Sequence, residues 1–256
     1  MRQQMSASYP TKLYLAMKSG NKCALKDCRA FLTSEGDKAD PVVIGEAAHV
    51  YGENQGTDKK PPSARYKADM TNDTRNHYDN LIYLCPTCHT KIDKQEKDYP
   101  AELLFKIKND HEAWIFEQLD ESMSDVTFAE LEIAAKTIAS GKYTGNGDFS
   151  VITPEEKIEK NGLTKEIHAL ITTGLSRSAE VGEYLVRATY LDEKFTERLK
   201  TGFKEKYMEL KIIMSGDDLF MAMFKFSQAG QRDFKQQAAS LAILSHLFHL
   251  CEVFEK

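Results

Sequence analysis

The sequence predicts an α+β protein with a small, cysteine-stapled N-terminal module followed by an α-helical bundle. Four of its five cysteines form two close pairs, Cys23 with Cys28 and Cys85 with Cys88. Each pair can present two thiolates from one turn, and two pairs complete a closed tetrahedral zinc site. Short apolar stretches between the pairs indicate strands, whereas helical spacing prevails from residue 153 almost to the end.

The composition is that of an ordinary globular chain. Of the 256 residues, 41% are hydrophobic and 29% are charged, which suits one large or two modest domains with real cores. No apolar run approaches the roughly 18 residues of a membrane span, and the start lacks the apolar core of a signal peptide. Because the cysteines also show metal-binding spacing, we expect a cytoplasmic protein with no membrane partner.

The N-terminal module is predicted to alternate short helices and strands. Residues 10–20 indicate a short helix that leads into the first cysteine pair. Residues 41–45 and 47–50 are two short β stretches bent near Gly45, as in a first hairpin. The polar, turn-rich segment 52–70 predicts a long functional loop.

Beyond this loop the pattern becomes apolar again. Leu81 to Leu84 form a short predicted strand, and the second cysteine pair leads from it into a helix that carries His89 and Asp93. Another helix is expected to start at Pro100, since proline is favoured in the first turn.

Two motifs accompany the cysteine pairs. Residues 44–49 read Ile-Gly-Glu-Ala-Ala-His, and residues 80–93 read Asn-Leu-Ile-Tyr-Leu-Cys-Pro-Thr-Cys-His-Thr-Lys-Ile-Asp. With these motifs in this order, the stretch from about Cys23 to Trp114 resembles the HNH endonucleases, most closely a zinc-stapled branch found among bacterial antiviral effector nucleases. The resemblance implies a ββα-metal nuclease module that cleaves DNA. It does not reach the last hundred or so residues.

The resemblance also implies roles for three side chains. His49 stands at the general-base position, where an imidazole of near-neutral pKa suits removal of a proton from water. Asn80 matches the central asparagine, whose amide would fix the loop carrying His49. His89 would bind a catalytic divalent metal, Mg²⁺ or Mn²⁺, while the four paired cysteines hold a structural Zn²⁺.

The second ligand of the catalytic metal is open. Many HNH enzymes carry an aspartate directly before the base histidine, but Ala48 occupies that position here, as in the branch that the chain most resembles. Glu46 would share a strand face with Ala48, and Asp93 lies one turn after His89 on the same helix face, so both are candidates. The simpler alternatives are that His89 is a zinc ligand or a core histidine, and that Asn80 is a turn residue before a strand.

The net charge of −5 does not favour tight binding to nucleic acid. The whole acidic excess lies in residues 120–256, because residues 1–119 carry 17 basic and 17 acidic side chains. A locally basic loop can nevertheless hold DNA phosphates, although these cations would also suit a solvated loop. The candidate phosphate contacts are Lys59, Lys60, Arg65, Arg75 and Lys91.

We expect three parts in the chain: a nuclease domain at 1–120, a linker at 121–160 and a helical domain at 161–256. The linker is expected to contain one short helix at 128–139. The turn cluster at 140–148 follows this helix.

The helical part raises the question of a partner. Apolar residues at steps of three and four from Tyr184 to Leu210 predict one long helix. The last predicted helix, at 234–254, is apolar over most of its circumference, so it needs a partner or a bundle around it. We expect a homodimer through this domain. The alternative is a central helix wrapped by residues 153–230 of the same chain.

Three functions stay open. The resemblance favours a metal-dependent DNA endonuclease that acts as the effector of a bacterial antiviral defence system, with a partner protein from that system. A non-catalytic zinc-knuckle module that binds nucleic acid would suit Ala48 and the weak basic charge. A structural adaptor would place the function in the helical half, where we find no catalytic constellation.

Overall fold

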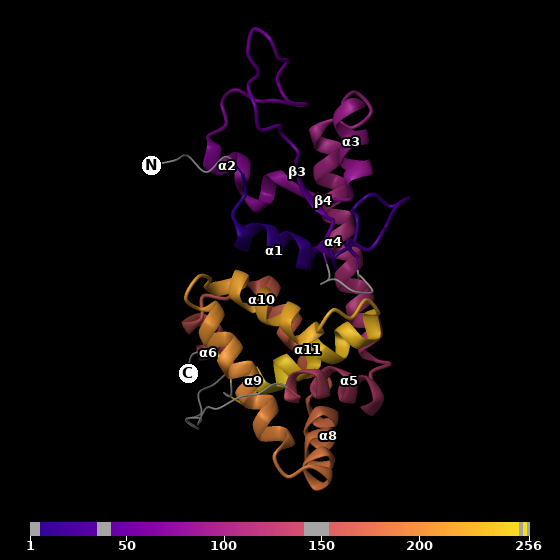
Figure 1. The fold of residues 1–256 in the computed structure, drawn as a ribbon, viewed down its shortest axis with the longest axis vertical. Helices are drawn as coiled ribbons and strands as arrows, with labels where there is room; N and C mark the ends of the chain where they lie inside the picture. Colours follow the sequence, from indigo (N-terminus) through magenta and orange to yellow (C-terminus); the bar gives the residue numbers. More distant parts are fainter. Residues whose placement is uncertain (1–5, 35–41, 141–153, 251–252, 255–256) are drawn as a thin grey trace. The chain divides into compact units, whose positions relative to one another are not determined.

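The computed structural model describes residues 6–34, 42–140, 154–250 and 253–254. It divides the chain into two compact units, Met1–Phe116 and Glu117–Lys256 (Figure 1). The described residues are mainly helical and include two small two-stranded sheets, so the mixed α and β class is confirmed. Pro41, Cys251 and all but the first residue of the turn cluster at 140–148 lie outside the described residues.

The first unit interleaves short helices with short strands, as the sequence predicts. The expected helix at 10–20 is present, and Ser8 caps it by accepting a hydrogen bond from the Thr11 backbone N–H at 3.2 Å. The elements in chain order are α1 (Tyr9–Lys18), β1 (Thr33–Ser34), β2 (Val42–Val43), β3 (Glu46–His49), α2 (Asn72–Asn76), the 3₁₀ helix η1 (Tyr78–Asn80), β4 (Leu81–Leu84), α3 (Pro86–Lys94) and α4 (Ala101–Met123), whose last residues belong to the second unit.

The strand pairing differs from the expected first hairpin. The two stretches on either side of Gly45 do not pair with each other: β2 pairs with β1, and β3 pairs with β4, both antiparallel. In the second sheet Glu46 lies opposite Leu84 and His49 lies opposite Leu81. A Cβ at Gly45 would lie 2.2 Å from the Tyr83 ring, so the bend needs a glycine. The expected hairpin is therefore corrected to a pairing between distant segments.

Strand β4 connects the core of the first unit to the helix that carries His89. All four of its residues are buried, as expected for an apolar run of this length. Cys85 follows at once and caps α3, its sulfur accepting from the Cys88 N–H at 3.3 Å, while Pro86 fills the first helical position. The strand therefore fixes where α3 begins.

The segment from 52 to 70 is a long loop, as expected, and forms no helix or named strand (Figure 1). Its base is closed by the Gly52 N–H, which donates to the Ala64 carbonyl at 3.1 Å. A Cβ on Gly52 would lie 2.4 Å from that same carbonyl oxygen, so only glycine allows this approach.

The second unit is a bundle of helices. No helix among the described residues is both long and apolar enough to cross a membrane. The helices that follow α4 are α5 (Phe128–Ala139), α6 (Pro154–Lys160), α7 (Lys165–Leu175), α8 (Ser178–Leu191), α9 (Phe195–Leu210), α10 (Gly216–Gln228) and α11 (Phe234–His249).

Helix α11 is the centre of this bundle. It packs against α5, α7, α8 and α10 of its own chain, and residues 237–248 are buried without interruption. Figure 1 shows α11 among these helices, of which α5, α8 and α10 are labelled. From the sequence, its apolar circumference is expected to need a second copy of the chain. That reason for a homodimer is wrong, because the chain's own helices cover the apolar surface.

Two further expectations for this half are corrected. Helix α5, assigned to a linker, packs against α11 and α9 and buries Leu131, Ala135 and Ile138, so it belongs to the bundle. The single helix expected from Tyr184 to Leu210 is two helices, because Asp192 adopts an extended conformation after α8. The apolar spacing continues across the break because both helices bury a face in the same bundle.

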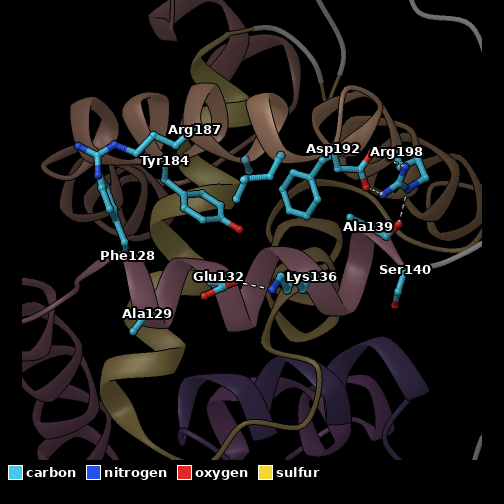
Figure 2. Close-up of a pocket in the computed structure, with 13 residues that line it drawn as sticks. Phe128, Ala129, Glu132, Lys136, Ala139, Ser140, Tyr184, Arg187, Asp192 and Arg198 are labelled. Atoms are coloured by element: carbon cyan, nitrogen blue, oxygen red, sulfur yellow. Dashed lines mark hydrogen bonds and ion pairs between the residues drawn. The ribbon is translucent and has the colours of Figure 1, made fainter.

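A cavity of about 630 Å³ opens between α5, α8 and the start of α9. Its walls include Phe128 and Tyr184, and Arg187 lies over the Phe128 ring at 4.7 Å (Figure 2). The charges at its rim already pair with each other or with neighbours: Glu132 with Lys136, Asp192 with Arg198, and Arg187 with Glu183. The cavity therefore offers apolar walls rather than unpaired catalytic groups.

Candidate functional site

The four paired cysteines converge in the first unit. Their sulfur atoms all lie within 4.8 Å of one another, and the Cys28 and Cys85 sulfurs are 3.9 Å apart. A tetrahedral zinc ion with bonds of about 2.3 Å requires sulfur separations of about 3.8 Å. The donor set and its spacing are therefore compatible with a structural zinc site closed by protein ligands.

The chemistry of these thiols also suits a metal. Burial raises the pKa of Cys23 to about 11. For Cys85, burial is the largest single influence and acts upward, but hydrogen bonds from Cys88 and neighbouring thiols outweigh it and lower the pKa. Four thiolates packed this closely would repel one another. A divalent cation compensates their charge, so its binding drives the loss of the thiol protons.

The first cysteine turn is fastened to the second sheet by backbone hydrogen bonds. The Ala24 N–H donates to the Tyr83 carbonyl at 2.9 Å, and the Cys23 N–H donates to the Ala30 carbonyl at 2.9 Å. Arg29, in the left-handed conformation with φ of 47°, closes this turn. The two cysteine pairs therefore meet because one pair begins directly after β4, and β4 binds the turn that carries the other.

His89 lies between the two carboxylates that the sequence offered as alternative metal ligands. Its Nδ1 is 2.7 Å from the Glu46 carboxylate, and its Nε2 is 3.3 Å from that of Asp93. The hydrogen bond with Asp93 contributes most to raising the pKa of His89, and Glu46 adds to it, while burial opposes both. The structure brings these three residues from β3 and α3 together, and His89 is not among the cysteine cluster.

His49 lies at the other end of β3. Its Nε2 is 3.1 Å from the side-chain oxygen of Asn76, a residue of α2 that we did not single out from the sequence. The ring is half-buried, so water can reach it. Among the contacts of the described residues none joins His49 to His89. Glu46, the β3 residue that contacts His89, lies three residues from His49, or about 10 Å along the strand.

Asn80 is buried, with 3% of its surface exposed. Its side-chain oxygen accepts from the Tyr51 N–H at 2.9 Å, and its amide nitrogen donates to the carbonyls of Tyr51 at 3.1 Å and Arg75 at 2.9 Å. It therefore fastens the chain just after His49, which is more than a turn residue would do.

Lys108 and Glu112 of α4 form a buried pair that contacts the backbone next to Asn80. The Lys108 ammonium donates to the carbonyls of Tyr78 at 2.8 Å and Leu81 at 2.9 Å, on either side of Asn80, and lies 3.5 Å from Glu112. Burial lowers the pKa of Lys108 to about 8. A lysine and a glutamate four residues apart on the predicted helix were visible in the sequence, but their burial was not.

Two of the five candidate phosphate contacts are corrected. The Arg65 side chain is only 6% exposed and bonds to protein groups, and Arg75 is buried with its guanidinium donating to the carbonyls of Gly52, Lys67 and Met70. Neither cation is placed to reach a phosphate. The remaining three candidates, Lys59, Lys60 and Lys91, are exposed.

A scan of protein-family models found no match for this chain, and a search of curated proteins found no relative. Function is therefore inferred from the motifs and the geometry alone.

Proposed function

We propose that this protein is a metal-dependent endonuclease of the HNH type that hydrolyses DNA phosphodiester bonds. The observation that carries the proposal is the meeting of Glu46, His89 and Asp93 in the space between β3 and α3. The order β3, β4, α3 corresponds to the ββα-metal module implied by the sequence motifs, and the four cysteines brace it.

His89 and one carboxylate would hold the catalytic metal. Since Glu46 and Asp93 face opposite ring nitrogens, only one can share a metal with His89 while the other orients the ring. Asp93 is also paired with Arg65, so we assign Asp93 to orientation and Glu46 to the metal. Imidazole and carboxylate donors suit Mn²⁺ or Mg²⁺ completed by water. When bound, such a cation supplies charge neutralisation at the phosphate and at the leaving 3′ oxygen.

His49 would act as the general base. If its Nε2–H donates to Asn76, the Nδ1 atom is free to accept a proton from water. Asn80 would keep the end of β3, and with it His49, in a fixed place by bonding Tyr51. Preorganisation of this kind raises the rate by avoiding misplacement of the base.

DNA would contact three exposed lysines of the first unit. Lys59 and Lys60 lie on the 52–70 loop, and Lys91 lies on α3, two residues after His89. With three such cations and an acidic second unit, we propose weak, salt-sensitive binding to DNA. A role as the effector of a bacterial antiviral system with a partner protein is supported by the resemblance alone.

A non-catalytic zinc-knuckle module that binds nucleic acid is the second candidate. It is favoured by Ala48, which is fully buried where many HNH enzymes have a metal-binding aspartate. Plasmid cleavage with Mg²⁺ or Mn²⁺, comparing wild type with His49→Ala, separates the two. Nicking by the wild type that the variant loses supports the nuclease. Equal absence of cleavage in both proteins, with DNA binding retained, would establish the second candidate instead.

A further inference from the structure

We propose that Arg65 is a positioning residue that fixes His89 through Asp93 and holds the end of β3 against α3. The proposal rests on the proposed function only in treating His89 as the metal-binding histidine. It replaces the sequence-based expectation that Arg65 contacts phosphate, since the side chain is buried and already bonds to protein groups.

The three contacts of the Arg65 guanidinium join two segments of the site. Its Nε donates to the Val50 carbonyl at 2.8 Å, one residue after the proposed base. Its Nη1 donates to the Ile92 carbonyl at 2.8 Å, and its Nη2 donates to the Asp93 carboxylate at 2.7 Å. One planar group therefore links the residue directly after β3 to α3, and β3 and α3 carry the two histidines.

Arg65 adopts a backbone conformation that is unfavourable for a residue with a side chain. Its φ is 55°, in the left-handed region. Its own N–H points to the Glu96 carboxylate at 3.3 Å, outside the 52–70 loop. Strain of this kind persists where surrounding contacts hold it, and here those contacts are made by the Arg65 side chain itself.

The bond to Asp93 is the step that reaches His89. One Asp93 oxygen accepts from Arg65, and the other lies 3.3 Å from the His89 Nε2. Because the Asp93 side chain is 43% exposed, it would be free to turn toward water without the arginine. The imidazole would then lose the partner that sets its ring orientation. A lysine could supply the charge but not the three-way planar fork.

Arg75 provides a matched control. It is a second buried arginine that packs against the same loop, and its guanidinium bonds to Gly52, Lys67 and Met70 rather than to α3. Loss of its side chain should loosen the loop without releasing Asp93. A comparison of the two arginines therefore separates the specific contact from general loop order.

The experiment measures Mn²⁺ binding by calorimetry to zinc-loaded full-length protein, in wild type, Arg65→Met, Arg65→Lys, Asp93→Asn and Arg75→Met. We expect Arg65→Met and Asp93→Asn each to weaken Mn²⁺ binding about 10- to 100-fold, with zinc content unchanged. The double variant Arg65→Met with Asp93→Asn should bind Mn²⁺ no more weakly than either single variant, because both substitutions act through one contact. Arg65→Lys should restore only part of the affinity. Additive losses, or an equal loss in Arg75→Met, would overturn the proposal.

Crystal structures of zinc-loaded Asp93→Asn and Arg65→Met provide a readout that needs neither cleavage nor Mn²⁺. In Arg65→Met we expect the Asp93 carboxylate to leave His89, and the imidazole to change its ring orientation. An unchanged pair at its present 3.3 Å would refute the positioning role. If wild type neither cuts DNA nor binds Mn²⁺ but the ring turns in Arg65→Met, the nuclease proposal fails and the positioning role stands.

Discussion

The side chain of Asn80 bonds to both main-chain polar groups of Tyr51, accepting from its N–H at 2.9 Å and donating to its carbonyl at 3.1 Å. The Asn80 carbonyl in addition accepts from the Val50 N–H at 2.8 Å. Asn80, the last residue of η1 and the one directly before β4, therefore completes the backbone hydrogen bonds of the chain directly after His49. The first motif is held in place by the first residue of the second.

Asn80→Ala should destabilise the first unit. It leaves the Tyr51 N–H and carbonyl and the Arg75 carbonyl without their partner, and each buried unpaired group costs about 1–3 kcal/mol. Urea unfolding of zinc-loaded protein should show a loss of about 3 kcal/mol. Asn76→Ala, at a less buried position, should cost much less. Equal stability of the two variants would contradict the role of Asn80.

Cys85→Ser should release zinc and unfold the first unit. Serine is a good helix N-cap, so α3 keeps its cap and only the metal ligand is lost. Because a closed zinc site contributes directly to folding, we expect a large fall in the melting temperature of this unit and no bound zinc by elemental mass spectrometry. His89→Ala should keep one equivalent of zinc. Zinc lost from His89→Ala would show that the division into two sites is incorrect.

His49→Ala should abolish cleavage with little effect on stability or DNA affinity. A general base acts in the transition state, and its removal typically lowers the rate about 10²- to 10⁴-fold. Single-turnover cleavage with Mn²⁺ measures this step, and the products of the wild type should carry 5′-phosphate and 3′-hydroxyl ends. Loss of DNA binding in the variant would instead assign His49 to substrate contact.

Lys108 should titrate near pH 8, well below an ordinary lysine. NMR of the protein labelled with ¹³C-lysine measures this directly. Because the Glu112 carboxylate raises the pKa against the effect of burial, Glu112→Gln should lower it further.

The stability linked to Lys108 has a defined direction. Its pKa is lower in the folded than in the unfolded chain, so the unfolded chain binds more protons between about pH 8 and 10.5. The contribution of Lys108 to the free energy of unfolding therefore rises with pH through that window. A pH-independent difference between wild type and Lys108→Met would contradict the shifted titration.

The helical unit should fold only when α5 is included. A fragment of residues 117–256 keeps the helix that covers one side of α11, whereas a fragment of residues 150–256 exposes that apolar surface. Circular dichroism with urea should show a cooperative transition for the longer fragment, and aggregation or a broad transition for the shorter one. Cooperative unfolding of a soluble 150–256 monomer would show that α5 is dispensable.

The sequence by itself determined the local elements and the chemistry of their residues. Strand β4 and helix α5 have the predicted bounds, because a short apolar run and an amphipathic run capped by Thr127 and Glu130 are local signals. The cysteine pairs likewise predicted a cluster of four thiols compatible with zinc, since two close pairs can supply the four ligands of a tetrahedral ion.

Only the tertiary structure decided which distant groups meet. The pairing of β3 with β4, the burial of Arg65 and the place of α11 at the centre of its bundle depend on contacts between segments far apart in the chain. Hydrophobic spacing shows that a helix has an apolar surface, but not whether its own chain covers it. An arginine on a polar loop is likewise predicted to be exposed. Only the fold brings it the carbonyl and carboxylate partners that allow it to be buried.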